Sequence, residues 1–361
     1  MSASCNATAP VTPLDNSELA PTLAAIRTNC HISDARHATD YTLCVYLLKM
    51  REYFRWENNI PYHATLPREQ LTAWLTQREE HWDDLENSQF ESIPVQGSLH
   101  DPFDSPAINK ELNELGYIYS SGYGRNMKPV FFLGELEQRR QHDGYTLLVS
   151  GKEFARDLSA PPAMSLDNTI FVRRESLRRM CWEKIEEWRW NEPENAMQKA
   201  MMYYDFDSKP DASLDAMTDM ALQSVLFHEI GEVQAGKRLG NGWKTMLSSM
   251  QHSKAEIMLR AVRDNLADAL STLPGLLREA DEASIHFYMA NMSNMRKELF
   301  PAAVSAYENW SARGDIRELE LLLENAVTHW QSLAETCLEL HKEHKDNCEP
   351  ALIAVIEANI L

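Results

Sequence analysis

The chain has 361 residues, a length that corresponds to about two domains of roughly 150 residues, each large enough to bury its own core. Acidic residues dominate, with 54 Asp and Glu against 35 Lys and Arg, and the formal net charge is -19. A field of this sign repels nucleic acid and anionic lipid, which argues against both as partners. We therefore expect an unknown small molecule or protein as the partner, and the sequence leaves the oligomeric state open.

The start of the chain carries no export signal. Residues 1–28 are rich in Ser, Thr, Ala, Asn and Pro and lack the basic and continuously apolar regions of a signal peptide. No later stretch reaches the roughly 18 consecutive apolar residues of a membrane span. Scattered cysteines without a C-x-x-C pair favour reduced thiols. We expect a cytoplasmic protein that begins with a mobile, disordered arm over residues 1–28.

Two helices are predicted after the arm. Apolar residues recur at helical spacing over residues 35–56, and Ser33 is the expected N-cap of this long amphipathic helix. A second helix is predicted over residues 68–85, because an amphipathic pattern follows Pro67.

Ionisable residues crowd the predicted start of the first helix: His31, Asp34, Arg36, His37 and Asp40. Asp34 and Asp40 suit a capping role, in which a carboxylate interacts favourably with the positive end of the helix dipole. Alternatively, Arg36 and His37 form a recognition patch that holds an anion. The sequence does not separate these two interpretations.

A small antiparallel sheet is predicted next. Alternating residues rich in aromatic and β-branched types are separated by turns of Gly, Asn and Asp, and these runs cover 117–119, 130–133 and 145–149. A further short strand is expected over 169–172 and a helix over 175–190. Gly122 and Gly124 are assigned to a hairpin turn, because no Walker lysine follows them and the chain has no nucleotide-binding signature.

The rest of the chain has helical periodicity and little glycine. Helices are predicted over 214–239, 242–250, 253–271, 280–297, 301–312 and 316–343. The polar stretch 205–215 is the expected domain boundary. The predicted fold class is therefore α+β, predominantly α. A mixed domain over 29–210 holds helices around the sheet, and an α-helical bundle covers 211–361.

A segment within the predicted helix 214–239 resembles the zinc-binding helix of metalloproteases. His228 and Glu232 are four residues apart and share a face, with Glu229 beside them. In such proteases the glutamate is the catalytic base and a second histidine stands where this chain has Glu232. Apolar residues cover most of the circumference, which predicts a buried helix whose carboxylates need partners. We therefore expect His228 and Glu232 as metal ligands and Glu229 as a catalytic residue.

Two later helices carry similar pairs at the same spacing. Asp264 and Asp268 are four residues apart, as are Glu282 and His286. Helical bundles build di-metal carboxylate sites from Glu, Asp and His on facing helices, and we count all four residues as candidate ligands. Iron or manganese would suit an oxidase-like site, and zinc would suit a hydrolase-like one. The sequence thus predicts a possible metal-dependent enzyme.

A different interpretation needs no metal. The carboxylates of these helices can instead pair with the nearby basic residues Lys237, Arg238, Arg260 and Arg263 in a buried salt-bridge network. The chain would then be a non-catalytic interaction or structural protein. Both interpretations stay open.

The segments ISDARHATDYTLC (32–44), HDGYTLLVSGK (142–152) and FHEIGE (227–232) together resemble a family of bacterial proteins of unknown function. The resemblance spans nearly the whole chain. It implies a bacterial cytosolic protein with a fixed two-part organisation, and it transfers no catalytic residue.

Overall fold

The computed structural model describes residues 16–124, 127–142, 144–166, 168–250, 253–279 and 281–361. They form two compact units, residues 1–182 and 183–361. The division therefore lies earlier than the polar stretch 205–215, which instead contains the start of a long helix. Among the described residues, no helix combines the length and the apolar character that a membrane crossing requires.

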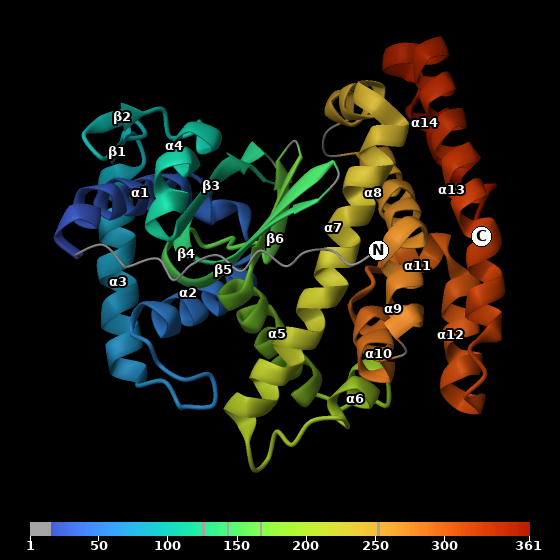
Figure 1. The fold of residues 1–361 in the computed structure, drawn as a ribbon, viewed down its shortest axis with the longest axis horizontal. Coiled ribbons are helices and arrows are strands. Elements are labelled where there is room, and N and C mark those ends of the chain that lie inside the picture. Colours follow the sequence, from blue (N-terminus) through green and yellow to red (C-terminus); the bar gives the residue numbers. More distant parts are fainter. Residues whose placement is uncertain (1–15, 125–126, 143, 167, 251–252, 280) are drawn as a thin grey trace. The chain divides into compact units, whose positions relative to one another are not determined.

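The first unit, unit 1, contains helices around a sheet, as predicted (Figure 1). Its elements are α1 (Asn16–His37), η1 (Ala38–Asp40), α2 (Leu43–Glu57), α3 (Arg68–Leu85), β1 (Ile93–Val95), β2 (Ser98–His100), α4 (Ser105–Leu112), η2 (Asn113–Leu115), β3 (Tyr117–Tyr123), β4 (Pro129–His142), β5 (Tyr145–Arg156), β6 (Ala163–Leu166) and β7 (Thr169–Arg173). Helix α5 (Arg174–Arg189) crosses the division between the units.

The main sheet has five strands in the order β3-β4-β5-β7-β6. Neighbouring strands are antiparallel except β5 and β7, which are parallel. The prediction of an antiparallel sheet needs this one correction. The short strand β6 takes the edge position and pairs with β7 alone, so β7 lies between β6 and β5 and runs parallel to β5.

Helix α1 occupies part of the predicted arm. Leu19, Ala25 and Ile26 are buried in the core of unit 1, because α1 packs against β1, β4 and β5. The arm prediction is therefore wrong for residues 16–28, and residues 1–15 lie outside the described residues. Apolar residues at helical spacing among the Ser, Thr and Asn residues explain the difference.

The single helix predicted over 35–56 is two helices. Helix α1 ends at His37, a 3-10 turn follows, and α2 begins after Thr42, whose extended backbone makes it the N-cap. Ser33 therefore lies inside α1, where its hydroxyl donates to the carbonyl of Pro129 rather than capping a helix. By contrast, α3 covers the predicted residues 68–85.

The second unit, unit 2, is helical, as predicted. After α5 its elements are α6 (Ala196–Met201), α7 (Pro210–Ser249), α8 (Lys254–Ala267), a π-helical turn (Asp268–Thr272), α9 (Leu273–Glu279), α10 (Glu282–Asn291), α11 (Asn294–Leu299), α12 (Pro301–Arg313), α13 (Arg317–His344), η5 (Lys345–Asn347) and α14 (Glu349–Glu357). Helix α7 joins two predicted helices across a kink at Gly240, whose φ of 69° is in the left-handed region that favours glycine.

Helix α8 is central to unit 2. It packs against α7, α11, α13 and α14, and α7 and α13 lie beside it in Figure 1. Its buried face carries Met258, Leu259 and Val262, which join one hydrophobic core with Trp243 and Trp330. This packing fixes the facing sides of α7 and α8, where the candidate site lies.

Candidate functional site

Helix α7 approaches the end of α8 at a glycine. A Cβ atom on Gly231 would lie 2.2 Å from the carbonyl oxygen of Ala267, so a larger residue would separate the two backbones. Directly after Ala267 the helix widens into the π-helical turn Asp268–Thr272. Such turns occur frequently at functional sites. His228 lies about one helical turn before Gly231 and therefore faces the start of this π-helical turn.

A buried carboxylate orients His228. The Nδ1 atom of His228 lies 2.8 Å from Asp268 Oδ1, and since an ionised carboxylate can only accept, the imidazole donates. The other ring nitrogen, Nε2, is 3.6 Å from Glu232 Oε1. With Nδ1 protonated, a neutral His228 presents the lone pair of Nε2 on the side of Glu232.

Asp268 is fully buried and has a complete set of partners. Thr272 Oγ1 donates to Oδ1 at 2.7 Å, and the Tyr288 hydroxyl donates to Oδ2 at 2.6 Å. Arg296 pairs with Oδ2 and also donates to the Tyr288 hydroxyl at 3.1 Å. Asp268 is thus held by the π-helical turn, α10 and α11 together, which makes it a rigid support for His228.

Three residues with metal-ligand chemistry converge beside this support. One ligand atom from each of His228, Glu232 and Asp264 lies within 4.8 Å of the other two. Arg263 reaches the same place, because its Nη2 atom is 2.7 Å from Glu232 Oε1 and 3.2 Å from Asp264 Oδ1. The cluster therefore combines two carboxylates, one imidazole and one guanidinium at the interface of α7 and α8.

Glu229 is the unsatisfied member of this region. It is 8% exposed, and its Oε2 atom is buried without a hydrogen-bond partner among the described residues. Burial, together with the negative charge of Glu232, raises the pKa of Glu229 to about 7. For Glu232, burial acts in the same direction, but the neighbouring imidazole of His228 and the charge of Arg263 outweigh it and lower its pKa to about 2.

The structure does not bring the last predicted pair into this cluster. Glu282 accepts a hydrogen bond of 2.5 Å from the Tyr203 hydroxyl. His286 is buried, its Nδ1 atom is 2.9 Å from the Tyr307 hydroxyl, and its ring packs on Trp310 with 4.9 Å between centroids. Neither residue belongs to the group of metal-type ligands that gathers among the described residues. A di-metal centre that uses this pair is not assembled.

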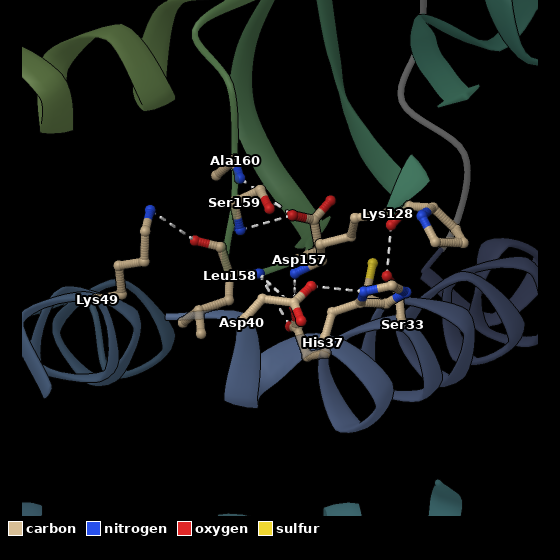
Figure 2. Close-up of polar contacts among 12 residues, drawn as sticks. Ser33, His37, Asp40, Lys49, Lys128, Asp157, Leu158, Ser159 and Ala160 are labelled. Atoms are coloured by element: carbon tan, nitrogen blue, oxygen red, sulfur yellow. Dashed lines mark hydrogen bonds and ion pairs between the residues drawn. The ribbon is translucent and has the colours of Figure 1, made fainter. Parts of the chain in front are cut away.

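The ionisable cluster near the first helix has structural partners. Asp34 is fully buried in the last turns of α1, where Lys128 donates to it at 2.7 Å and the Leu158 amide at 2.9 Å. Figure 2 shows Asp157 beside this group, where it accepts from the amides of Ser159 and Ala160. Asp34 therefore ties α1 to the segments just before β4 and just after β5, and it does not cap a helix start.

The proposed anion patch of Arg36 and His37 is not formed. Arg36 donates to the carbonyl oxygens of Glu86 and Ser88, and His37 contacts Asp40 at 2.9 Å (Figure 2). The ring of His31 faces a different surface, between α1 and α3, and it is taken up below.

Two domain families match the chain. The model of the N-terminal domain of a family of unknown function, DUF6866, covers residues 22–173, and the model of its C-terminal domain covers 178–359. The chain belongs to the DUF6866 family. The resemblance seen in the sequence is thereby confirmed as to family. No curated protein and no solved structure matches the chain. The cluster at His228 lies in the DUF6866 C-terminal domain.

Gly231 of this DUF6866 chain offers a direct test of the close approach between α7 and α8. We expect Gly231→Ala to lower the free energy of unfolding by about 1–3 kcal/mol, because the added methyl group meets backbone atoms that cannot rotate away. Hydrogen exchange of peptides from α7 and α8 measures this change.

Gly236→Ala is the matched control, since it lies in the same helix and its added methyl group meets nothing within 4 Å. It should stabilise the helix by up to about 1 kcal/mol. Equal destabilisation by both changes would contradict a special role for Gly231.

Proposed function

We propose that the protein is a metal-dependent hydrolase whose site lies in unit 2, with His228, Glu232 and Asp264 as ligands of one divalent ion. The observation that carries this proposal is the hydrogen bond of 2.8 Å between His228 Nδ1 and Asp268. A metal-binding histidine almost always donates its second ring N–H to such a carboxylate, which fixes the tautomer and raises the basicity of the ligand nitrogen. Here that nitrogen lies beside Glu232.

The donor set fits a borderline divalent ion. One imidazole nitrogen and two carboxylates suit zinc, manganese or ferrous iron. Three protein ligands leave a coordination position open, as catalytic sites require. When bound, the ion would act as a Lewis acid on a carbonyl or phosphoryl oxygen of the substrate.

Glu229 has the properties of the proton acceptor in this proposal. Its buried Oε2 atom has no hydrogen-bond partner among the described residues, so it is available to a water molecule or a substrate. It would take the proton of the attacking water and return it to the leaving group. A hydrolytic reaction is favoured over an oxidase-like one, because Glu282 and His286 have other partners and supply no second set of ligands.

Arg263 competes with a metal ion for two of the proposed ligands. Its Nη2 atom contacts an oxygen of Glu232 and an oxygen of Asp264, so it neutralises two of the proposed ligands. Its side chain is 24% exposed, which leaves it a path to turn toward solvent. We infer that an entering ion replaces the guanidinium as the counter-charge of these carboxylates.

The test is calorimetric titration of the full chain, stripped with EDTA and purified without a histidine tag, using ZnCl2 and MnCl2. We expect one ion per chain. His228→Ala and Glu232→Gln should each weaken binding roughly tenfold or more. Glu282→Gln is the control and should leave the affinity unchanged. Absence of saturable binding, or equal affinity in His228→Ala, would contradict the proposal.

The contacts of Arg263 support a second candidate, a purely structural ion-pair network in a non-catalytic interaction protein. Glu232→His separates the two, since it restores two histidines at the zinc-protease spacing. In a metal site, added zinc should raise the melting temperature of this variant. In a structural network, Arg263 loses Glu232 and keeps only Asp264, and the variant should be destabilised with or without zinc.

A further inference from the structure

A groove in unit 1 lies between α1 and α3 and shares no residue with the proposed metal site. It has a volume of about 220 Å³ and is lined by His31, Trp74, Gln77, Arg78 and His81. Gln77 and His81 are exposed, and His31 and Arg78 are half-buried. None of the lining side chains carries a carboxylate. The volume is below that of a drug-sized site, so a ligand here is small.

Arg78 is held rigidly in the groove. Its Nη2 atom donates to both carboxylate oxygens of Glu57 at 2.7 Å, and its guanidinium lies over the ring of Trp74, 5.0 Å from the centroid. Glu57 also accepts from the Trp74 indole at 2.6 Å. Because these contacts already fix the side chain, Arg78 loses little further conformational freedom when a ligand binds. The Nε–H of Arg78 has no partner among the described residues, so it is available to donate a hydrogen bond to a ligand.

The hydrogen bonds of His31 fix which of its nitrogens carries the proton. The Trp82 indole donates to His31 Nδ1 at 3.3 Å, and an indole N–H cannot accept. Nδ1 must therefore be the unprotonated nitrogen, and the proton is on Nε2. Burial and the positive charges of Arg78, His81 and Arg27 lower the pKa of His31 to about 3, so the ring stays neutral and keeps this tautomer. Arg78 Nη1 lies 3.2 Å from Nδ1 and 3.1 Å from Nε2, and as a donor it can share only the lone pair of Nδ1.

The polar groups of the groove are consequently mostly donors. The lining residues offer Nε2–H of His31, the amide NH2 of Gln77, a ring N–H of His81 and Nε–H of Arg78, and none of the lining residues is acidic. The charges that act on His31 are all positive. A ligand with several acceptor oxygens and a negative charge would satisfy these donors.

We propose that this groove binds a small oxyanion, a carboxylate or a phosphate group, between α1 and α3. Arg78 donates its Nε–H beside the ion pair that it makes with Glu57. His31 and Gln77 donate further hydrogen bonds, and the ring of Trp74 forms an apolar wall. The net charge of the chain is -19, so the protein repels anions overall. The groove would be a local exception to this repulsion.

The test uses calorimetric titration of the full chain with sodium phosphate and, separately, with sodium acetate at constant ionic strength. We expect saturable binding of at least one of them. Gln77→Glu places a negative charge at the exposed rim without touching a buried group, and it should weaken binding at least tenfold. Gln70→Glu adds the same charge to an exposed position of α3 outside the lining, and it should change the affinity less than twofold.

Tighter binding of phosphate than of acetate assigns the groove to phosphate esters, and the reverse order assigns it to carboxylates. Arg78→Gln, checked for folding by its thermal melt, should abolish either signal. The proposal is overturned if neither anion binds saturably, or if Gln70→Glu and Gln77→Glu weaken binding equally. These outcomes do not depend on the metal site in unit 2.

Discussion

Replacing Asp268 by asparagine is expected to destabilise unit 2 by about 3–5 kcal/mol. Asp268 is fully buried and is the counter-charge of Arg296, which lies in the same interior at 13% exposure. Asparagine retains the shape but removes the charge, so the buried guanidinium of Arg296 loses the carboxylate that contacts it. Peptides of α7 and α8 should then exchange their amide hydrogens much faster, because hydrogen exchange detects local opening of this region without unfolding of the whole chain.

The control for this prediction is Asp315→Asn. Asp315 also pairs with an arginine, Arg317 at 2.5 Å, but both side chains are exposed to solvent. Water replaces the lost partner there, so we expect exchange to remain as in the unmodified chain. If Asp268→Asn and Asp315→Asn gave the same exchange rates, Asp268 would not be the support that holds His228.

Glu229→Gln is expected to stabilise the metal-free protein at alkaline pH. In the folded chain burial raises the pKa of Glu229 from 4.5 to about 7. The stability that comes from its protonated form is complete below about pH 4.5 and is lost as the pH rises through 7. Above pH 7 the ionised side chain costs on the order of 3 kcal/mol. Glutamine resembles the protonated carboxyl group and avoids this cost, so the variant should be the more stable protein at pH 8 but not at pH 5.

Glu232→Gln should show the opposite behaviour. Although burial opposes it, the neighbouring imidazole of His228 and the charge of Arg263 lower the pKa of Glu232 to about 2. Its contribution to stability is therefore present above about pH 4.5 and is lost as the pH falls through 2. Urea unfolding of both variants after EDTA treatment, at pH 5 and pH 8, compares the two residues. Parallel pH profiles for Glu229→Gln and the unmodified chain would contradict the raised pKa.

The sequence predicted the fold well wherever local signals determine it. Helix α3 begins directly after Pro67, and its amphipathic pattern ends at Leu85 as expected. The break between α1 and α2 was missed, because residues 38–42 contain neither glycine nor proline and the turn depends on tertiary packing. Strand pairing could not be predicted from local patterns either. The sequence predicted the strand over 169–172, which is β7, but it missed the edge strand β6 and did not show that β7 lies next to β5.

The same limit applies to the candidate site. Spacing along one helix predicted that His228 and Glu232 share a face, and 3.6 Å separates their side-chain atoms. Spacing could not show that Asp268 would contact His228 while Asp264 joins His228 and Glu232 in one cluster, because that depends on how α7 and α8 approach. Tyr288 and Arg296 were missed for this reason, since no periodic signal connects them with Asp268.

The most direct measurement is anomalous X-ray diffraction from crystals of the full chain soaked with MnCl2. The proposed function predicts one manganese peak within about 2.2 Å of His228 Nε2 and of oxygens from Glu232 and Asp264, with the Arg263 side chain turned away from them. A map without a peak there, in which Arg263 still bridges Glu232 and Asp264, would contradict a metal centre and leave the cluster as a structural ion-pair network.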